Sequence, residues 1–259
     1  MYHPVLKLNP NGAPVISGSE LDTIGERLVT DFLQIPPLEP KTIDIDRFVT
    51  RYLHMGLDYK FLSHCGLYLG TTIFTSSDKI PVYIPEKNRA EYIHVNSHTI
   101  IIDETLLDEK QEKRYRFTLG HEASHGVLHE QFFLRNDGHC SLYEEEAAGI
   151  RCRSDYYDLR EKSSVVWTDI RRVEWQANRL SAAILMPKSM VAVMVARNPL
   201  NRNVMSGYGL AYAMGETFNV STEAAYYRLV DLGYVDKEYP VRNQQASIFG
   251  FTCCSSNTG

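Results

Sequence analysis

The 259-residue chain lacks the features that mark several special classes of protein. It has no apolar run near the ~18 residues that a membrane-spanning helix needs, and its first twenty residues contain no apolar segment of the signal-peptide kind. With 16 Gly and 11 Pro it has too few of either residue for a collagen-like or low-complexity chain. These absences favour a folded globular protein, which we expect to be cytoplasmic and to have no membrane partner.

Cysteine and positive charge are also in short supply. The five cysteines are an odd number and lie far apart, except for the vicinal pair Cys253 and Cys254, so we expect reduced thiols and no disulfide framework. The 27 Lys and Arg residues against 32 Asp and Glu residues leave a net charge of −5. This balance provides no long-range attraction for phosphate backbones, and no direct contact with nucleic acid is expected.

The periodicity of apolar residues predicts an α+β chain in which helices come first, then strands, then helices. A first helix is expected to be capped by Ser19 and to end before Pro36. A short helix follows at Ile45–Tyr52, and the region from Asp58 to Asp103 is rich in β-branched residues. Its three expected strands, paired in an antiparallel sheet, cover residues 67–74, 80–84 and 92–102.

Helical patterns dominate the second half of the chain. We expect helices over 114–130, over 171–186 up to Pro187, near 210–217 and over 221–232, with a loop that includes some helix between 136 and 164. The predicted division is an N-terminal helical extension (1–40), a metallopeptidase-like domain (41–195), a C-terminal helical subdomain (196–235) and a loosely ordered tail (236–259).

The strongest chemical signal is the sequence His121-Glu122-Ala123-Ser124-His125, an H-E-x-x-H motif within a helical pattern. Residues four apart lie on one face of a helix, so both imidazoles can reach one metal ion while Glu122 points beside it. Gly120 and Gly126 flank the motif, and glycine inside a helix costs about 1 kcal/mol relative to alanine. Their presence favours close packing around a metal site.

A catalytic zinc needs three protein ligands and an open fourth position, so a third ligand is required. In the next helix Glu174 lies on a face of small residues, and Asn178, four residues on, is placed to accept the second ring N–H of a ligating histidine. We therefore predict Zn²⁺ bound by His121, His125 and Glu174, with Asn178 as support. The competing third ligands are His129, Glu130, His139 and Cys140.

His129 is the nearest of these competitors, but it follows His121 by eight residues, whereas the metzincin pattern places its third histidine ten residues after the first. A separate structural site built from His139, Cys140 and Cys152 is less favoured, because neither cysteine belongs to a C-x₂₋₄-C pair.

The two blocks RFTLGHEASHGVLH and EWQANRLSAAILMP resemble the ImmA/IrrE family of metallo-endopeptidases. The similarity extends through IDIDRFV, LGTTIF, HTIIIDETLL and FNVSTEAAYYRLVDLG, roughly residues 43–233. The resemblance implies a compact zincin-like α+β domain of the gluzincin type, with zinc held by His121, His125 and Glu174 and with Glu122 as the catalytic acid and base. It also implies a specific protein target, typically a transcriptional repressor in stress response or in the control of mobile elements, against which the protein would act as an antirepressor.

These inferences lead to one expected function and one alternative. The expected function is zinc-dependent hydrolysis of a peptide bond, in which Glu122 takes a proton from water activated by the metal. Residues 99–103 are expected to form the sheet edge to which an extended substrate adds. The alternative is a zinc-containing regulatory protein that binds a repressor or another partner without proteolysis.

The segment VSTEAAYYRLVDLG is similar to the second half of a helix-turn-helix motif. A recognition helix needs cations and amides that face the groove, and this one offers Arg228 against Glu223 and Asp231. We therefore expect a structural role for this helix.

Overall fold

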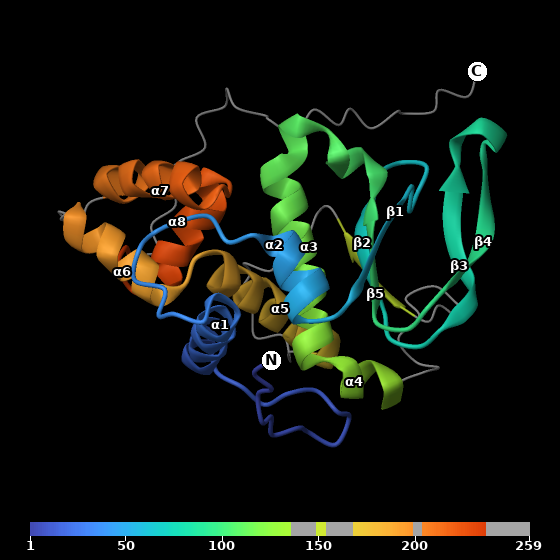
Figure 1. The fold of residues 1–259 in the computed structure, drawn as a ribbon, viewed down its shortest axis with the longest axis horizontal. Helices are drawn as coiled ribbons and strands as arrows, with labels where there is room; N and C mark the ends of the chain where they lie inside the picture. The colour runs from blue at the N-terminus through green and yellow to red at the C-terminus, as the bar shows by residue number, and fades with distance from the viewer. Residues whose placement is uncertain (136–148, 154–167, 199–203, 237–259) are drawn as a thin grey trace.

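The computed structural model describes residues 1–135, 149–153, 168–198 and 204–236 (Figure 1). Within them, helices combine with a small sheet, which confirms the predicted α+β class. The helices are α1 (Gly18–Leu33), α2 (Ile45–Arg47), α3 (Glu112–Leu128), α4 (Glu130–Arg135), α5 (Asp169–Leu185), α6 (Lys188–Arg197), α7 (Val204–Phe218) and α8 (Thr222–Asp231). The strands are β1 (Gly56–Lys60), β2 (Tyr68–Ile73), β3 (Ser77–Ile84), β4 (Arg89–Val95), β5 (Thr99–Asp103) and β6 (Gly149–Arg153).

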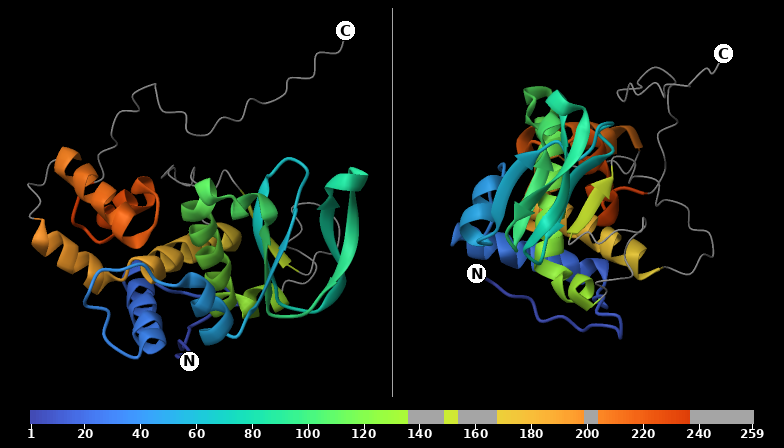
Figure 2. Two further views of the ribbon diagram at one scale, coloured as in Figure 1. Left: turned by 45° about the horizontal axis from the view of Figure 1, so that its top comes forward. Right: turned by 90° about the vertical axis from the view of Figure 1, so that its right-hand side faces the viewer.

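Helix α3 stands between the two halves of the fold. In Figure 1 and Figure 2, the sheet lies on one side of it and helices α6, α7 and α8 lie on the other. Helix α5 crosses α3 and makes its most extensive helical contact there. One continuous hydrophobic core joins residues of α1, α3, α5, α7 and α8, including Leu28, Leu119, Leu180, Met214 and Leu229. The division into four segments stays a prediction, and residues 237–259 of the expected tail lie outside the described residues.

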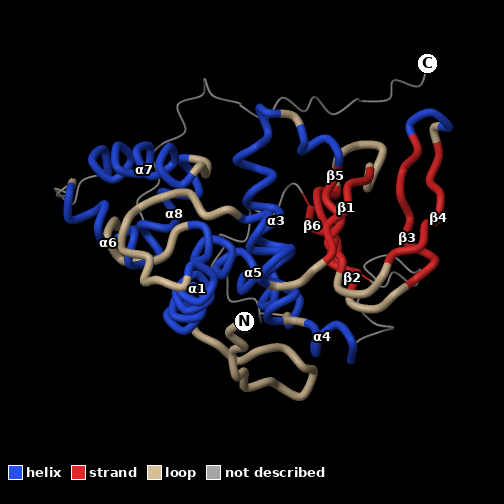
Figure 3. The backbone as a smooth tube through the Cα atoms, viewed as in Figure 1, coloured by secondary structure: helices blue, strands red, loops and turns tan. Residues whose placement is uncertain are grey.

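The strands form two sheets instead of the single antiparallel sheet that was predicted (Figure 3). Four strands pair in the order β1-β5-β2-β6, and β3 pairs with β4 as a separate antiparallel hairpin. Strand β2 runs antiparallel to β5 and to β6, but β1, which was not predicted, runs parallel to β5. Strand β6 lies within the 136–164 segment for which a loop with some helix was expected.

The prediction of a single strand over residues 92–102 was wrong. A turn at Asn96–His98 divides it, and His98 has a left-handed backbone with φ of 55°. The backbone N–H of Ser97 donates to Ser76 Oγ at 2.8 Å, which fastens the turn. The β-branched residues on both sides suit strands equally well, so the apolar pattern continued through a turn signalled only by Asn96 and Ser97.

One predicted helix boundary changed, and one helix was not predicted. Ser17, and not Ser19, caps α1: its side chain accepts from the backbone N–H of Glu20, whose carboxylate accepts from the backbone N–H of Ser17. This reciprocal capping box is the stronger start signal because it satisfies two unpaired backbone donors. Pro187 ends α5 as expected, but the chain at once begins α6, which was not predicted.

A buried ion cluster ties α1, α5 and α8 together. Asp22 of α1 accepts from Arg179 Nη2 at 2.6 Å and pairs with Arg228, whose side chain is fully buried. Arg179 also meets Asp231 Oδ1 at 2.7 Å. Burial alone would raise the pKa of Asp22, but Arg179 and Arg228 hold it below its usual value. Arg228 is thus an internal residue that ties α8 to α1.

We expect Asp22→Asn to lower the free energy of unfolding by about 3–5 kcal/mol, because it leaves two largely desolvated guanidinium groups without their shared carboxylate. Urea titration measures the change. Asp78→Asn is the matched control, because Asp78 is exposed and pairs only with the exposed His94 among the contacts described for it. Equal stability of the two variants would show that the cluster does not hold the helices together.

None of the described helices has, by itself, both the length and the hydropathy needed to span a lipid bilayer. Helices α5 and α6 together have the length and apolar composition of a membrane span, but the chain bends by 58° at their junction.

Candidate metal centre

Helices α3 and α5 bring the predicted metal ligands together. His121 and His125 lie one turn apart on the face of α3 that meets Glu174 of α5. Gly120 permits this approach, since a Cβ there would lie 2.6 Å from Ser181 Oγ of α5. Gly126 is equally confined, with Met55 Sδ 2.7 Å from the position of a Cβ. Both glycines therefore serve the close packing that the sequence predicted.

The three side chains converge on one point. His121 Nε2 lies 3.2 Å from Glu174 Oε2, His125 Nε2 lies 3.6 Å from Glu174 Oε1, and the two Nε2 atoms are 3.0 Å apart. Ligands about 2.0–2.1 Å from a tetrahedral zinc ion are separated by roughly 3.3 Å, so the three distances have the size of the edges of such a site. Among the described residues, this is the group of His, Cys, Asp and Glu side chains that could hold a metal ion.

The electrostatics of this group also favour a cation. All three side chains are buried, and Glu174 Oε2 has no hydrogen-bond partner. Burial lowers the pKa of His125, which favours the neutral imidazole that a metal requires. Burial alone would raise the pKa of Glu174, but His125 and His121 hold it well below its usual value, so this carboxylate is ionised. A buried carboxylate facing two ring nitrogens is a costly arrangement unless a positive charge joins them.

Asn178 lies where the sequence placed it. Its Oδ1 is 2.9 Å from His121 Nδ1. An amide oxygen can only accept, so Nδ1 of His121 carries a proton, and Nε2 is the nitrogen that faces Glu174 and His125. Asn178 therefore orients one of the two histidines that could hold a metal ion, as predicted.

We expect Asn178→Ala to weaken zinc binding about 10- to 100-fold, as the loss of a ligand's hydrogen-bond partner does in other metal sites. Competition with a chromophoric chelator measures the change. Asn96→Ala, in the exposed turn before β5, is the control and should bind zinc like the wild type. Unchanged affinity in Asn178→Ala would assign Asn178 to packing alone.

Glu122 is fully buried between α3 and β2. Its Oε2 lies 2.7 Å from the hydroxyl of Thr72, while Oε1 has no partner. Gly70 leaves the space that this side chain occupies, because a Cβ there would lie 2.8 Å from Glu122 Cγ. Burial raises the pKa of Glu122 to about 7, against the lowering effects of His121 and Thr72. A carboxylate with this pKa and one unpartnered oxygen is suited to accept and return a proton near neutral pH.

Thr72 and Gly70 were not identified as site residues from the sequence. Both belong to the LGTTIF segment, which contributed to the family resemblance but has no metal-ligand spacing. Their contact with Glu122 depends on the packing of β2 against α3, which neither segment predicts alone.

Two of the competing ligands, His129 and Glu130, are described, and neither joins the three side chains. His129 is fully buried behind His125, with its Nδ1 2.9 Å from His125 Nδ1. The carboxylate of Glu130 instead lies 2.9 Å from His98 Nε2. Burial and the neighbouring His125 lower the pKa of His129 well below its usual value, so it is neutral. His139 and Cys140 lie outside the described residues, as does the side chain of Cys152 in β6, so the alternative structural site stays untested.

The prediction that residues 99–103 form the free sheet edge for a substrate was wrong. Strand β5 pairs with β1 on one side and with β2 on the other, so both of its edges are occupied. The strand next to Glu122 is β2, and its second edge pairs with β6. The prediction failed because it rested on sequence proximity to α3, while the position of β5 is set by pairing with the unpredicted β1.

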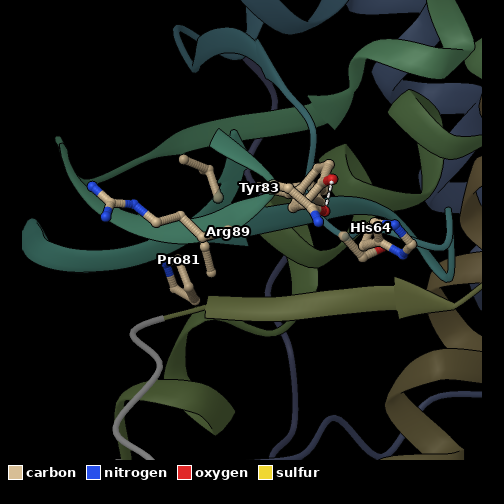
Figure 4. A pocket seen from close by; sticks show the side chains of 9 residues that line it. His64, Pro81, Tyr83 and Arg89 are labelled. Atoms are coloured by element: carbon tan, nitrogen blue, oxygen red, sulfur yellow. Dashed lines mark hydrogen bonds between the residues drawn. The ribbon is translucent and has the colours of Figure 1, made fainter. Parts of the chain in front are cut away.

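A separate cleft of about 500 Å³ lies at the β3–β4 hairpin (Figure 4). His64 packs edge-on against Tyr83 there, and Tyr83 donates to Asn88 Oδ1 at 2.7 Å. Arg89 is paired with Glu91. None of the predicted site residues lines this cleft. Its lining residues are Leu62, Ser63, His64, Pro81, Val82, Tyr83, Asn88, Arg89 and Ala90.

No protein-family model matches this chain, and no curated protein matches it significantly. The case for the metal chemistry therefore rests on the site itself.

Proposed function

We propose that this protein is a zinc-dependent endopeptidase of the zincin type, with a gluzincin arrangement of ligands. The observation that carries the proposal is the buried group of His121, His125 and Glu174, beside which Glu122 keeps one carboxylate oxygen without a partner. A site that only stabilised the fold would have no need of a second buried acid at this place. Two imidazoles and one carboxylate match the ligand sets of catalytic zinc, which keeps its remaining position open.

Each residue then has a defined task. Zinc bound there would supply Lewis acidity that polarises a peptide carbonyl and makes water acidic near neutral pH. Glu122 accepts a proton from the attacking water as the new carbon–oxygen bond forms, and it delivers that proton to the amine as the carbon–nitrogen bond breaks. Thr72 holds one oxygen of Glu122 and leaves the other for this transfer. Asn178 and His129 contact the outer ring nitrogens of the two histidine ligands.

The proposed substrate is a specific protein, such as a transcriptional repressor, and not proteins in general. The support for this target is the resemblance to the ImmA/IrrE family across residues 43–233. The same resemblance supports an antirepressor role in stress response or in mobile-element control.

The proposal is tested by co-producing the protein with a repressor encoded beside it and then mapping new N-termini by mass spectrometry. We expect one defined cut, which disappears when the purified protein is stripped of metal with a chelator and returns with one equivalent of Zn²⁺. The proposal would be overturned if the zinc-loaded protein left every candidate repressor intact.

A further inference from the structure

A chain of hydrogen bonds leads away from the outer nitrogen of His125. His125 Nδ1 lies 2.9 Å from His129 Nδ1, and His129 Nε2 lies 2.9 Å from Gln176 Oε1. Gln176 Nε2 in turn donates to the backbone carbonyl of Pro14 at 2.8 Å. The three side chains in this chain are all buried, with no measurable exposure. Both ring nitrogens of His129 are thereby paired, and the contacts reach the outer nitrogen of a candidate metal ligand.

The direction of every bond in the chain is fixed from its far end. A backbone carbonyl can only accept, so the amide nitrogen of Gln176 must face Pro14 and the amide oxygen must face His129. His129 therefore carries its proton on Nε2 and presents a lone pair at Nδ1. This lone pair can only accept from His125, whose proton must then sit on Nδ1. His125 Nε2 is the nitrogen that faces His121 and Glu174, where it can bind a metal ion held between them.

We propose that His129 and Gln176 are positioning residues that set the tautomer and the ring orientation of the ligand His125, with the carbonyl of Pro14 as the fixed end of the chain. The proposal rests on the metal site of the proposed function, but it does not depend on whether that site cleaves peptides. It extends the control of ligand orientation, which Asn178 exerts on His121, to the second histidine.

The N-terminal segment holds the Pro14 carbonyl in place. Asn9 and Asn11 donate to the two carboxylate oxygens of Asp169, at the start of α5, at 2.9 and 2.7 Å. Gly12 lies against α4, where a Cβ would be 2.9 Å from the carbonyl oxygen of Gln131. The segment before α1 is thus fastened to α4 and α5. These helices flank the hydrogen-bond chain from His125 through His129 and Gln176 to Pro14, which we call the relay.

The test compares four variants for zinc affinity, each in the full chain and by chelator competition. His129→Leu removes the acceptor for His125 at similar volume and should weaken binding about 10- to 100-fold. His129→Asn returns an amide oxygen near the position of Nδ1 and should recover most of that loss. Gln176→Met leaves His129 free to adopt either tautomer and should give an intermediate loss. Leu128→Val, a core change in the same turn of α3, should leave affinity unchanged.

A second measurement reads the tautomer directly and needs neither metal nor activity. Long-range ¹H–¹⁵N correlation spectra of the metal-free wild type should show His125 protonated at Nδ1. In His129→Leu the same ring should show a mixture of the two tautomers. Thermal unfolding of each metal-free variant separates a change in affinity from a general loss of structure.

Two results would overturn the proposal: wild-type zinc affinity in folded His129→Leu, or equal losses in His129→Leu and His129→Asn that follow their loss of stability. Neither result would bear on repressor cleavage, so the relay can fail while the proposed peptidase stands. Conversely, a protein that cleaves nothing but shows the expected tautomer and the Asn rescue would support the relay and leave proteolysis as the failed proposal.

Discussion

Replacing Glu122 with Gln is expected to reduce cleavage of the target by about 10²- to 10⁴-fold while the fold and the bound zinc persist. Glutamine preserves the size of the side chain and can still meet the hydroxyl of Thr72, but its neutral amide cannot take a proton from water. The zinc content of the purified variant and its rate of target cleavage are the two measurements. Glu109→Gln, in the exposed 3₁₀ helix before α3, is the matched control and should cleave at the wild-type rate.

The same variant separates proteolysis from regulation by contact. If Glu122→Gln still binds the target but has no effect on it in the cell, then contact alone is insufficient and the peptidase proposal is supported. If the variant acts in the cell like the wild type, catalysis is not the function, and a zinc-containing protein that works by binding its partner becomes the better account.

Glu174→Ala is expected to lower zinc affinity by as much as His121→Ala does, because each removes one of three protein ligands. The loss should exceed that of Asn178→Ala or His129→Leu, which disturb only the orientation of a ligand. The affinity is measured by chelator competition, with metal-free folding checked by circular dichroism, since burial of two uncompensated imidazoles could also change stability. Glu109→Ala serves as the control. Retention of wild-type affinity by Glu174→Ala would remove Glu174 from the site.

The part of the site that the sequence predicts is the part built from helix geometry. His121, Glu122 and His125 are related by one turn of α3, and the spacing of Glu174 and Asn178 places both on the face of α5 that approaches it. A periodicity of 3.6 residues defines such faces without knowledge of the rest of the fold. The structure brings His121, His125 and Glu174 together and places Asn178 on His121, as that geometry predicts.

The residues that escaped prediction join the site through contacts distant in sequence. Thr72 reaches Glu122 across 50 residues, Gln176 reaches His129 across 47, and the carbonyl of Pro14 is 162 residues from Gln176. No local pattern connects these pairs. Contacts distant in sequence also explain the errors in the sheet. Strand β1 was not predicted, and the turn before β5 was predicted as part of a strand, because strand pairing is decided by partners elsewhere in the chain.

X-ray absorption at the zinc edge, recorded on the purified wild-type protein, tests the central claim most directly. Binding by His121, His125 and Glu174 predicts about one zinc per chain, with only nitrogen and oxygen neighbours at about 2.0–2.2 Å and the scattering pattern of two imidazoles. Sulfur neighbours at about 2.3 Å would place the metal on cysteines, and the absence of imidazole scattering would exclude the two histidines. Either result would contradict the assignment of this buried group as the zinc site.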